Sequence, residues 1–126
     1  MIDALFQQPE YLAAKRMMSA TVMERSAIAS NVANIETPDY HRLQVAPAFG
    51  AQLQEAIKSN DLGQLQNLTP ALEEDGTDVA GRIDGNNVVL EKELVGLMKN
   101  SLDHSLETQL VTGNLLQLRL AITGRV

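Results

Sequence analysis

The pattern of apolar and polar positions is most regular in the last third of the chain, from residue 88 to residue 122. Apolar side chains recur there in alternating steps of four and three, a repeat typical of a long helix packed lengthwise against another helix. Such a helix would extend roughly 50 Å, so it needs a partner of similar length. The predicted seam comprises Leu90, Leu94, Leu97, Val111, Leu115, Leu118 and Ile122.

Weaker positions interrupt this seam at Ser101, His104 and Thr108, and Gly113 lies in the same stretch. Glycine inside a helix is less favourable than alanine by about 1 kcal/mol. Two interpretations stay open. These positions are tolerated defects in an ordinary bundle, or they let further helices pack closely in an assembly and leave the free monomer loose.

The N-terminal third predicts the partner helix, over residues 9–34. Pro9 and Glu10 suit a first helical turn, and Pro38 requires the helix to end near Asn34 or Ile35. The apolar stripe is narrow and rich in alanine, which allows close approach of backbones. Its expected members are Tyr11, Ala14, Met18, Val22, Ala29 and Val32.

The middle of the chain is less regular. Spacings of four predict a short helix from about Pro47 to Lys58, and the acidic tract at residues 73–78 is typical of a solvated loop. Short strands remain an open alternative there. The predicted fold class is therefore mainly α, with long N-terminal and C-terminal helices paired as an antiparallel coiled coil. The expected boundaries are 1–40, 41–87 and 88–126.

Composition and charge narrow the function. Hydrophobic residues make up 44% of the chain but aromatic residues only 3%, which suits close helix packing better than a ligand pocket. The net charge of −6 comes from the middle segment, and no basic stripe predicts a nucleic-acid partner. The sequence contains neither a transmembrane run nor the pattern of a Sec signal peptide.

The sequence offers no enzyme constellation. It has no cysteine, two histidines and no glycine-rich phosphate loop, so we expect no catalytic residue, cofactor or small-molecule substrate. His104 with Asp103 and Glu107 could supply metal ligands, but a lone helical histidine is more often simply packed or exposed. We therefore expect no metal site.

One motif closes the first helix. The run Asn31-Val-Ala-Asn34-Ile-Glu-Thr37-Pro38-Asp-Tyr40 resembles the signature N-x-A-N-x-x-T-P-G-Y of bacterial flagellar rod and hook proteins. Asp39 replaces the usual glycine, and aspartate is among the residues that tolerate a left-handed backbone. The residue types alone would also fit an ordinary helix end followed by a turn.

A second motif precedes the long helix. Asp84-Gly85-Asn86-Asn87-Val88, continued to Leu94, resembles the D-G-N-N-V-D-L-E-x-E segment of the FlgB type within this family. Val89 stands where that type usually has aspartate, so Asn86 or Asn87 is expected to cap the helix instead. The two motifs cover both ends, about half of the chain.

The resemblance implies a structural subunit of the proximal rod of the flagellar basal body, which would assemble through its terminal helices into a helical tube. It also implies export by the flagellar type III apparatus to a periplasmic rod. The implied partners are copies of the chain, other rod proteins and the adaptor that joins rod to membrane ring.

Two other classes of function remain open from the sequence. A free-standing helical binding module or export chaperone would fold as a stable monomer or dimer and would not polymerise. A small hydrolase would depend on a pair of carboxylates, but nothing in the sequence selects two such residues.

Overall fold

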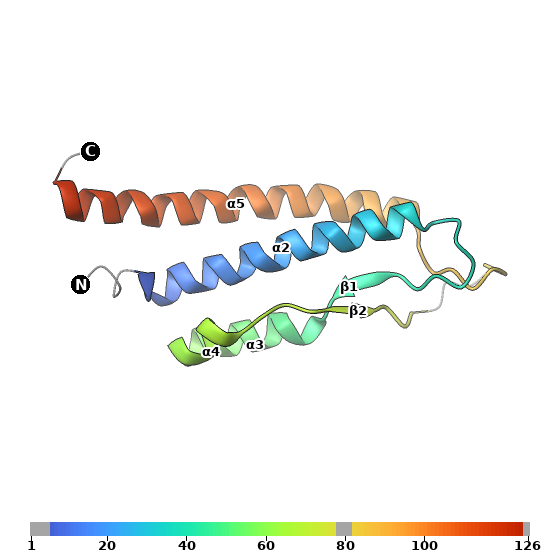
Figure 1. Cartoon of the computed structure of the whole chain (residues 1–126), viewed down its shortest axis with the longest axis horizontal. Helices are drawn as coiled ribbons and strands as arrows, with labels where there is room; N and C mark the ends of the chain where they lie inside the picture. The colour runs from blue at the N-terminus through green and yellow to red at the C-terminus, as the bar shows by residue number, and fades with distance from the viewer. Residues whose placement is uncertain (1–5, 78–81, 125–126) are drawn as a thin grey trace.

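The computed structural model describes residues 6–77 and 82–124. Two long helices dominate it and lie side by side, and the middle of the chain forms a third layer beneath one of them (Figure 1). The elements in chain order are α2 (Pro9–Ala33), β1 (Leu43–Val45), α3 (Pro47–Lys58), α4 (Leu62–Asn67), β2 (Leu72–Glu74) and α5 (Leu90–Thr123). The predicted fold class is confirmed: the protein is mainly helical, with paired terminal helices and a small middle segment.

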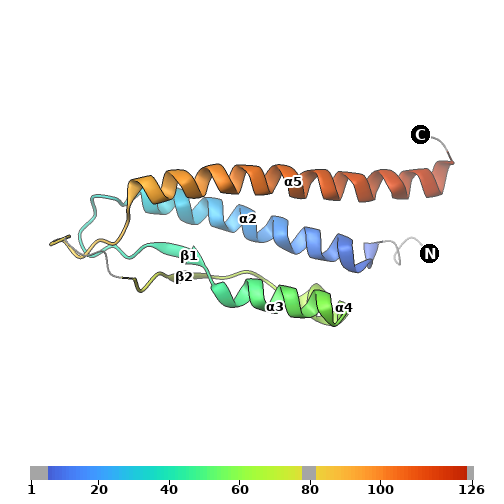
Figure 2. The ribbon, with the colours of Figure 1, turned by 180° about the vertical axis from the view of Figure 1, so that it is seen from behind.

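Helix α2 is the central layer. It contacts α5 on one side and β1, α3 and α4 on the other, and the view from behind shows the same order (Figure 2). Pro9 occupies its first turn, as expected, and the helix ends at Ala33 with Asn34 as its C-terminal cap. The prediction that Pro38 forces an end near Asn34 is therefore confirmed.

The apolar core lies between α2 and the middle segment, because the short helices α3 and α4 fold back against α2. Its buried side chains are Leu12, Ala13, Phe49, Leu53, Ala56, Leu65 and Leu68. The helix predicted from Pro47 to Lys58 is confirmed with those bounds. The stripe expected on α2 is wrong in part, since Val22 is 58% exposed while its neighbour Thr21 is buried.

A two-stranded antiparallel sheet joins the two halves of the middle segment. Leu43 of β1 lies opposite Glu74 of β2, and Val45 lies opposite Leu72. The open alternative of short strands is thus the correct one. The acidic tract is not wholly a loop, because Glu73 and Glu74 belong to β2, while Asp78 falls outside the described residues.

Candidate assembly site

A dense set of hydrogen bonds joins the end of α2 to the segment that leads into α5; we call it the junction. Its centre is Asn31, which has no exposed surface. The Asn31 side-chain oxygen accepts bonds from the Leu43 backbone N–H at 2.8 Å and the Tyr40 hydroxyl at 3.2 Å. Its amide donates to the Leu43 carbonyl at 2.9 Å and to a Glu93 carboxylate oxygen at 3.1 Å. One motif side chain therefore ties α2 to both β1 and α5.

The Glu93 carboxylate is fully buried in the junction and is neutralised by Arg42. The guanidinium of Arg42 lies 2.5 Å from one Glu93 oxygen and 3.2 Å from an oxygen of Asp75. Burial alone would raise the pKa of Asp75, but hydrogen bonds from Thr77 and the charge of Arg42 together lower that pKa below its ordinary value. Removing Arg42 would leave the buried Glu93 carboxylate without a positively charged partner, which is strongly destabilising.

Asn86 and Asn87 close the junction from the other motif. The Asn86 amide lies 2.8, 3.2 and 2.9 Å from the carbonyl oxygens of Asn34, Ile35 and Thr37, so it holds the turn that follows α2. Asn87 accepts from the Arg42 backbone N–H at 2.6 Å. Its amide donates to the carbonyls of Asp75 and Thr77.

The expectation that Asn86 or Asn87 caps α5 is wrong. Helix α5 begins at Leu90, and its N-cap is Val89, which makes no side-chain capping hydrogen bond. The two asparagine side chains are already engaged with α2 and the middle segment, so they stop short of α5. Glu91 and Glu93 in the first turn still place negative charge at the positive end of the helix dipole.

Two backbone turns approach each other closely within the junction. Asp39 has a φ of 56°, and its N–H donates to the Asp84 carbonyl at 2.7 Å. Gly85 has a φ of 73°, and a Cβ added there would lie 2.5 Å from an Asp39 carboxylate oxygen. The left-handed conformation expected at Asp39 is confirmed, and Gly85 is required both by its own φ and by this contact.

The structure brings all nine predicted motif residues to the junction region. Besides those already placed, the Asn34 amide donates to the Ser30 carbonyl at 2.9 Å, and the Thr37 hydroxyl donates to the Asn34 side chain at 3.2 Å. Pro38 is exposed in the turn. Asp84 pairs with Arg82 at 2.7 Å, and the hydrogen bond from Arg82 lowers the pKa of Asp84.

Sequence reasoning missed the roles of Arg42, Asp75 and Arg82, and it included Glu93 in the second motif without singling it out. Arg82 also donates to the carbonyls of Ile35 and Val88, so it bridges the two motifs. These charged residues flank the motifs or lie in the middle segment, where no periodicity selects them. A signal for Glu93 did exist, because it recurs at intervals of seven with two other polar residues on α5.

The face of α5 that meets α2 is this polar row: Glu93, Asn100 and Glu107, all buried. Asn100 donates to the Thr21 carbonyl at 2.8 Å and to Glu24 at 3.0 Å, and accepts from Arg25 at 3.0 Å. Thr21 donates to Glu107 at 2.7 Å. Thr21 thus lies opposite Glu107 and Asn31 opposite Glu93, which makes the helix pair antiparallel.

The predicted seam does not form this contact. Leu90, Leu94, Leu97, Leu115 and Ile122 are between 39% and 60% exposed, and Val111 and Leu118 are partly buried. The fully buried row of α5 is thus the polar one, while the seam meets α2 only at its edge: Leu97 lines a groove with Ile28, and Leu115 and Leu118 line a cavity with Tyr11. Its role in contacts between subunits stays a prediction.

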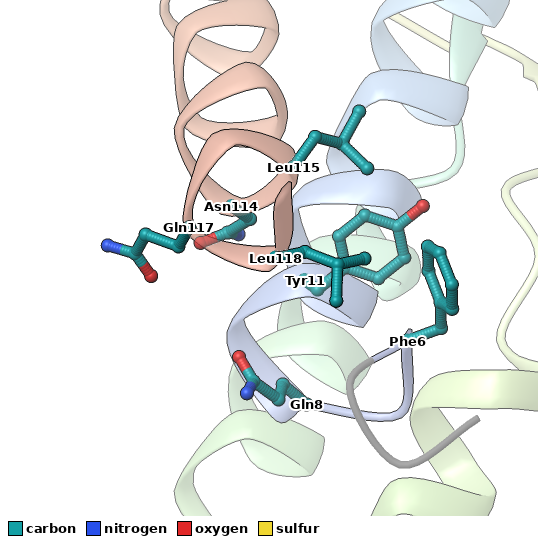
Figure 3. A pocket seen from close by; sticks show the side chains of 7 residues that line it. All are labelled: Phe6, Gln8, Tyr11, Asn114, Leu115, Gln117 and Leu118. Atoms are coloured by element: carbon teal, nitrogen blue, oxygen red, sulfur yellow. The ribbon is translucent and has the colours of Figure 1, made fainter. Parts of the chain in front are cut away.

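The opposite end of the helix pair is held differently. Figure 3 shows Phe6, Tyr11, Leu115 and Leu118 around a small cavity of about 70 Å³, where α2 begins and α5 nears its end. Phe6 and Tyr11 meet edge to face with ring centres 5.7 Å apart. Among the described residues at this end, the contacts between α2 and α5 are made mainly by these apolar side chains.

The described residues contain neither a candidate metal site nor a candidate membrane-spanning helix. Within residues 6–77 and 82–124, no group of three His, Cys, Asp or Glu side chains could hold a metal ion. No helix in the described part of the chain is long and apolar enough to cross a membrane. The main feature of the structure is its surface, because the two long helices are fixed together at one end and carry exposed leucines on their outer sides.

An antiparallel pair of terminal helices, closed by the N-x-A-N-x-x-T-P and D-G-N-N motifs in mutual contact, defines an axial subunit of the flagellar rod and hook class. No family model matches the chain. It is 30% identical over 114 residues to the flagellar basal body rod protein FlgB of Borrelia hermsii, covering 77% of this chain and 83% of that protein. The chain belongs to the FlgB family of flagellar basal-body rod proteins.

Proposed function

We propose that the chain is a structural subunit of the proximal rod, that its terminal helices assemble side by side into a helical tube, and that this tube transmits torque. The observation that carries the proposal is the outward side of α5. The two helices pair through polar groups, while large apolar side chains on both remain exposed. Contiguous exposed apolar surface usually marks an interaction site.

One exposed row lies on the side of α5 away from α2; we call it the ridge. Val95, Met98, Leu102 and Leu106 follow steps of three and four and are 66%, 75%, 62% and 51% exposed. Val95 is two residues from the buried Glu93, which places it about 200° around the helix. The ridge therefore faces away from α2 and is available for contact with another chain.

An apolar groove of about 390 Å³ lies on another side of the helix pair. Its lining residues are Arg25, Ile28, Ala29, Val32, Ala33 and Leu97. The ridge and the groove lie on different sides of one subunit, so contact between them in successive copies is head to tail. Contacts of this kind generate rings or open helical arrays.

The remaining partners follow from the same proposal. Other rod proteins would continue the tube, the adaptor would join it to the membrane ring, and the flagellar export apparatus would deliver the subunit to the periplasm. The division at 1–40, 41–87 and 88–126 is retained as part of the proposal. The ends form the assembly core, and the acidic middle lies outside it.

Charge placed in the groove or the seam tests assembly directly. Leu97→Asp and Leu115→Asp each put a carboxylate into apolar surface that we expect to be buried between subunits. Both should abolish large species in sedimentation velocity and motility in a complemented strain. Gln54→Asp adds the same charge at an exposed polar position of α3, outside the proposed assembly core, and it should assemble as the wild type does.

The alternative is a free-standing helical binding module or an export chaperone. It predicts a fully helical monomer or dimer at every concentration, with motility unchanged by both leucine substitutions. Normal motility in Leu97→Asp and Leu115→Asp would overturn the proposed assembly surface.

A further inference from the structure

A second cavity, of about 450 Å³, opens between α2, the start of α3 and α5. Its walls are mixed: Phe49 is apolar, while Thr21, Glu24, Lys99 and Glu107 are polar or charged. One water molecule occupies roughly 30 Å³ of liquid, so the space is much larger than a single bound water requires.

The carboxylate of Glu107 borders this cavity and is incompletely satisfied. The residue is 5% exposed, and one of its oxygens accepts the Thr21 hydroxyl at 2.7 Å. The other oxygen is buried and has no hydrogen-bond partner. A buried polar atom without a partner is unfavourable, and for a carboxylate the natural remedy is a positively charged donor.

The groups around Glu107 do not supply that donor. Burial raises the pKa of Glu107 above its ordinary value; the negative charges of Asp103 and Glu24 add to this effect, while Thr21 and His104 oppose it. Glu24 is already bonded to Asn100.

Lys99, the lysine in the cavity wall, cannot reach the unpaired oxygen of Glu107. Lys99 is eight residues before Glu107 on α5, about 12 Å along the axis at 1.5 Å per residue. Side chains on one helix meet at spacings of three or four, so Lys99 lies beyond reach.

We propose that this cavity receives a lysine or arginine side chain from a second copy of the chain, which pairs with Glu107 and Glu24 in the assembly. The proposal rests on the proposed rod function. A metal ion is disfavoured, since no group of three ligating side chains forms among the residues described.

The chain carries suitable donors on its outer surface. Arg119 is exposed on α5 and makes no ion pair with any described residue. Leu118 shares the small end cavity with Gln8, just before α2 begins, so Arg119 lies on the part of α5 that extends past α2. A projecting cation and an unfilled acidic cavity on the same chain are complementary between neighbouring copies.

The protonation state of Glu107 in the assembly provides the direct test. With ¹³C-labelled glutamate, we expect carboxyl NMR to show Glu107 titrating above ordinary glutamate in the dilute monomer and below it in assemblies of the purified chain. A pKa that stays raised in those assemblies overturns the proposal. A pKa that falls only when another rod protein is added overturns the second copy as the source.

Substitution gives an independent readout. Glu107→Gln keeps the shape and the Thr21 contact but removes the charge, so we expect the critical concentration for assembly to rise about tenfold, while the monomer folds at least as stably. Arg119→Gln should produce a similar rise if it is the donor. Glu55→Gln, an exposed change of equal charge on α3, should have no effect.

The outcomes separate the two proposals. Wild-type protein that assembles, together with Glu107→Gln protein that assembles equally well, overturns the cavity pairing and leaves the rod function intact. Wild-type protein that never forms large species overturns the rod function, and the cavity pairing with it.

Discussion

The two ends of the helix pair are held together by opposite means. At the junction, Asn31, Asn86 and Glu93 are almost completely buried, and each of these three side chains makes at least two hydrogen bonds. At the open end, Leu115 borders a small cavity and is 43% exposed, and the nearby Leu116 and Leu120 are 54% and 40% exposed. The difference shows which end of the helix pair is stabilised within the chain and which end leaves apolar side chains exposed. Directional polar bonds fix one end within the chain, whereas non-directional apolar surface at the other end is available to neighbours.

Removing the central junction side chain should have the largest effect. Asn31→Ala deletes four hydrogen bonds at a site with no exposed surface and takes one partner from the buried Glu93. We expect a loss of about 3 kcal/mol in the free energy of unfolding, measured by urea denaturation. Asn114→Ala at the open end is the matched control and should change it by less than about 1 kcal/mol. Equal losses in the free energy of unfolding for the two variants would contradict the contrast between the two ends.

Disturbing the close contact between the two motif turns should have the second-largest effect on stability. Gly85→Ala adds a Cβ that would lie 2.5 Å from the Asp39 carboxylate, at a φ of 73°. We expect a loss of about 1–3 kcal/mol in urea denaturation. Asp39→Gly alone should be neutral or slightly stabilising, because Asp39 has a φ of 56°. In the double variant, part of the Gly85→Ala loss should be recovered; strict additivity would mean that the two turns do not touch.

The junction and the polar row should respond to pH in opposite directions. The folded pKa of Asp75 is lowered, so its stabilising contribution is present above its ordinary value of 3.8 and is lost as pH falls through the folded pKa. The folded pKa of Glu107 is raised, so stability increases as pH falls through that pKa toward the ordinary 4.5.

Thermal unfolding of two variants against pH should resolve these contributions. Glu107→Gln should flatten the fall in stability that accompanies rising pH above 4.5. Asp75→Asn should flatten the loss in stronger acid, below 3.8. If Glu107→Gln leaves the upper part of the profile unchanged, Glu107 is not buried as described.

The smallest effect on the monomer should come from the ridge. Leu102→Gln changes a side chain that is 62% exposed, so we expect the free energy of unfolding of the monomer to shift by less than about 0.5 kcal/mol. The same variant should weaken assembly measured by sedimentation. A large loss of monomer stability would instead place Leu102 inside the subunit.

Sequence patterns predicted the helices well but not the sides on which they meet. Pro9, Pro38 and the turn residues mark helix ends through local chemistry, so the bounds of α2 and α3 followed directly. Periodicity shows which residues share a face, but α5 carries three usable faces. Periodicity alone does not tell which face α2 covers. In the structure α2 buries the row of Glu93, Asn100 and Glu107, while most of the leucine seam stays exposed.

The motif residues were recognisable, but the way they are bonded was not. Asn86 could be taken for a helix cap because asparagine favours that position. Its actual partners are carbonyls about fifty residues earlier in the chain, and a contact at that separation depends on how the whole middle segment folds. Arg42 and Asp75 were missed for the same reason.

The bond between the Asp39 N–H and the Asp84 carbonyl also closes the middle of the chain into a loop whose two ends are pinned together. The entropy of closing such a loop grows only with the logarithm of its length, so doubling it adds about 0.6 kcal/mol. Insertions between these two residues, away from β1, Asp75 and the core of α3 and α4, would leave the helix pair undisturbed. One pair of terminal helices could therefore carry middle segments of very different size.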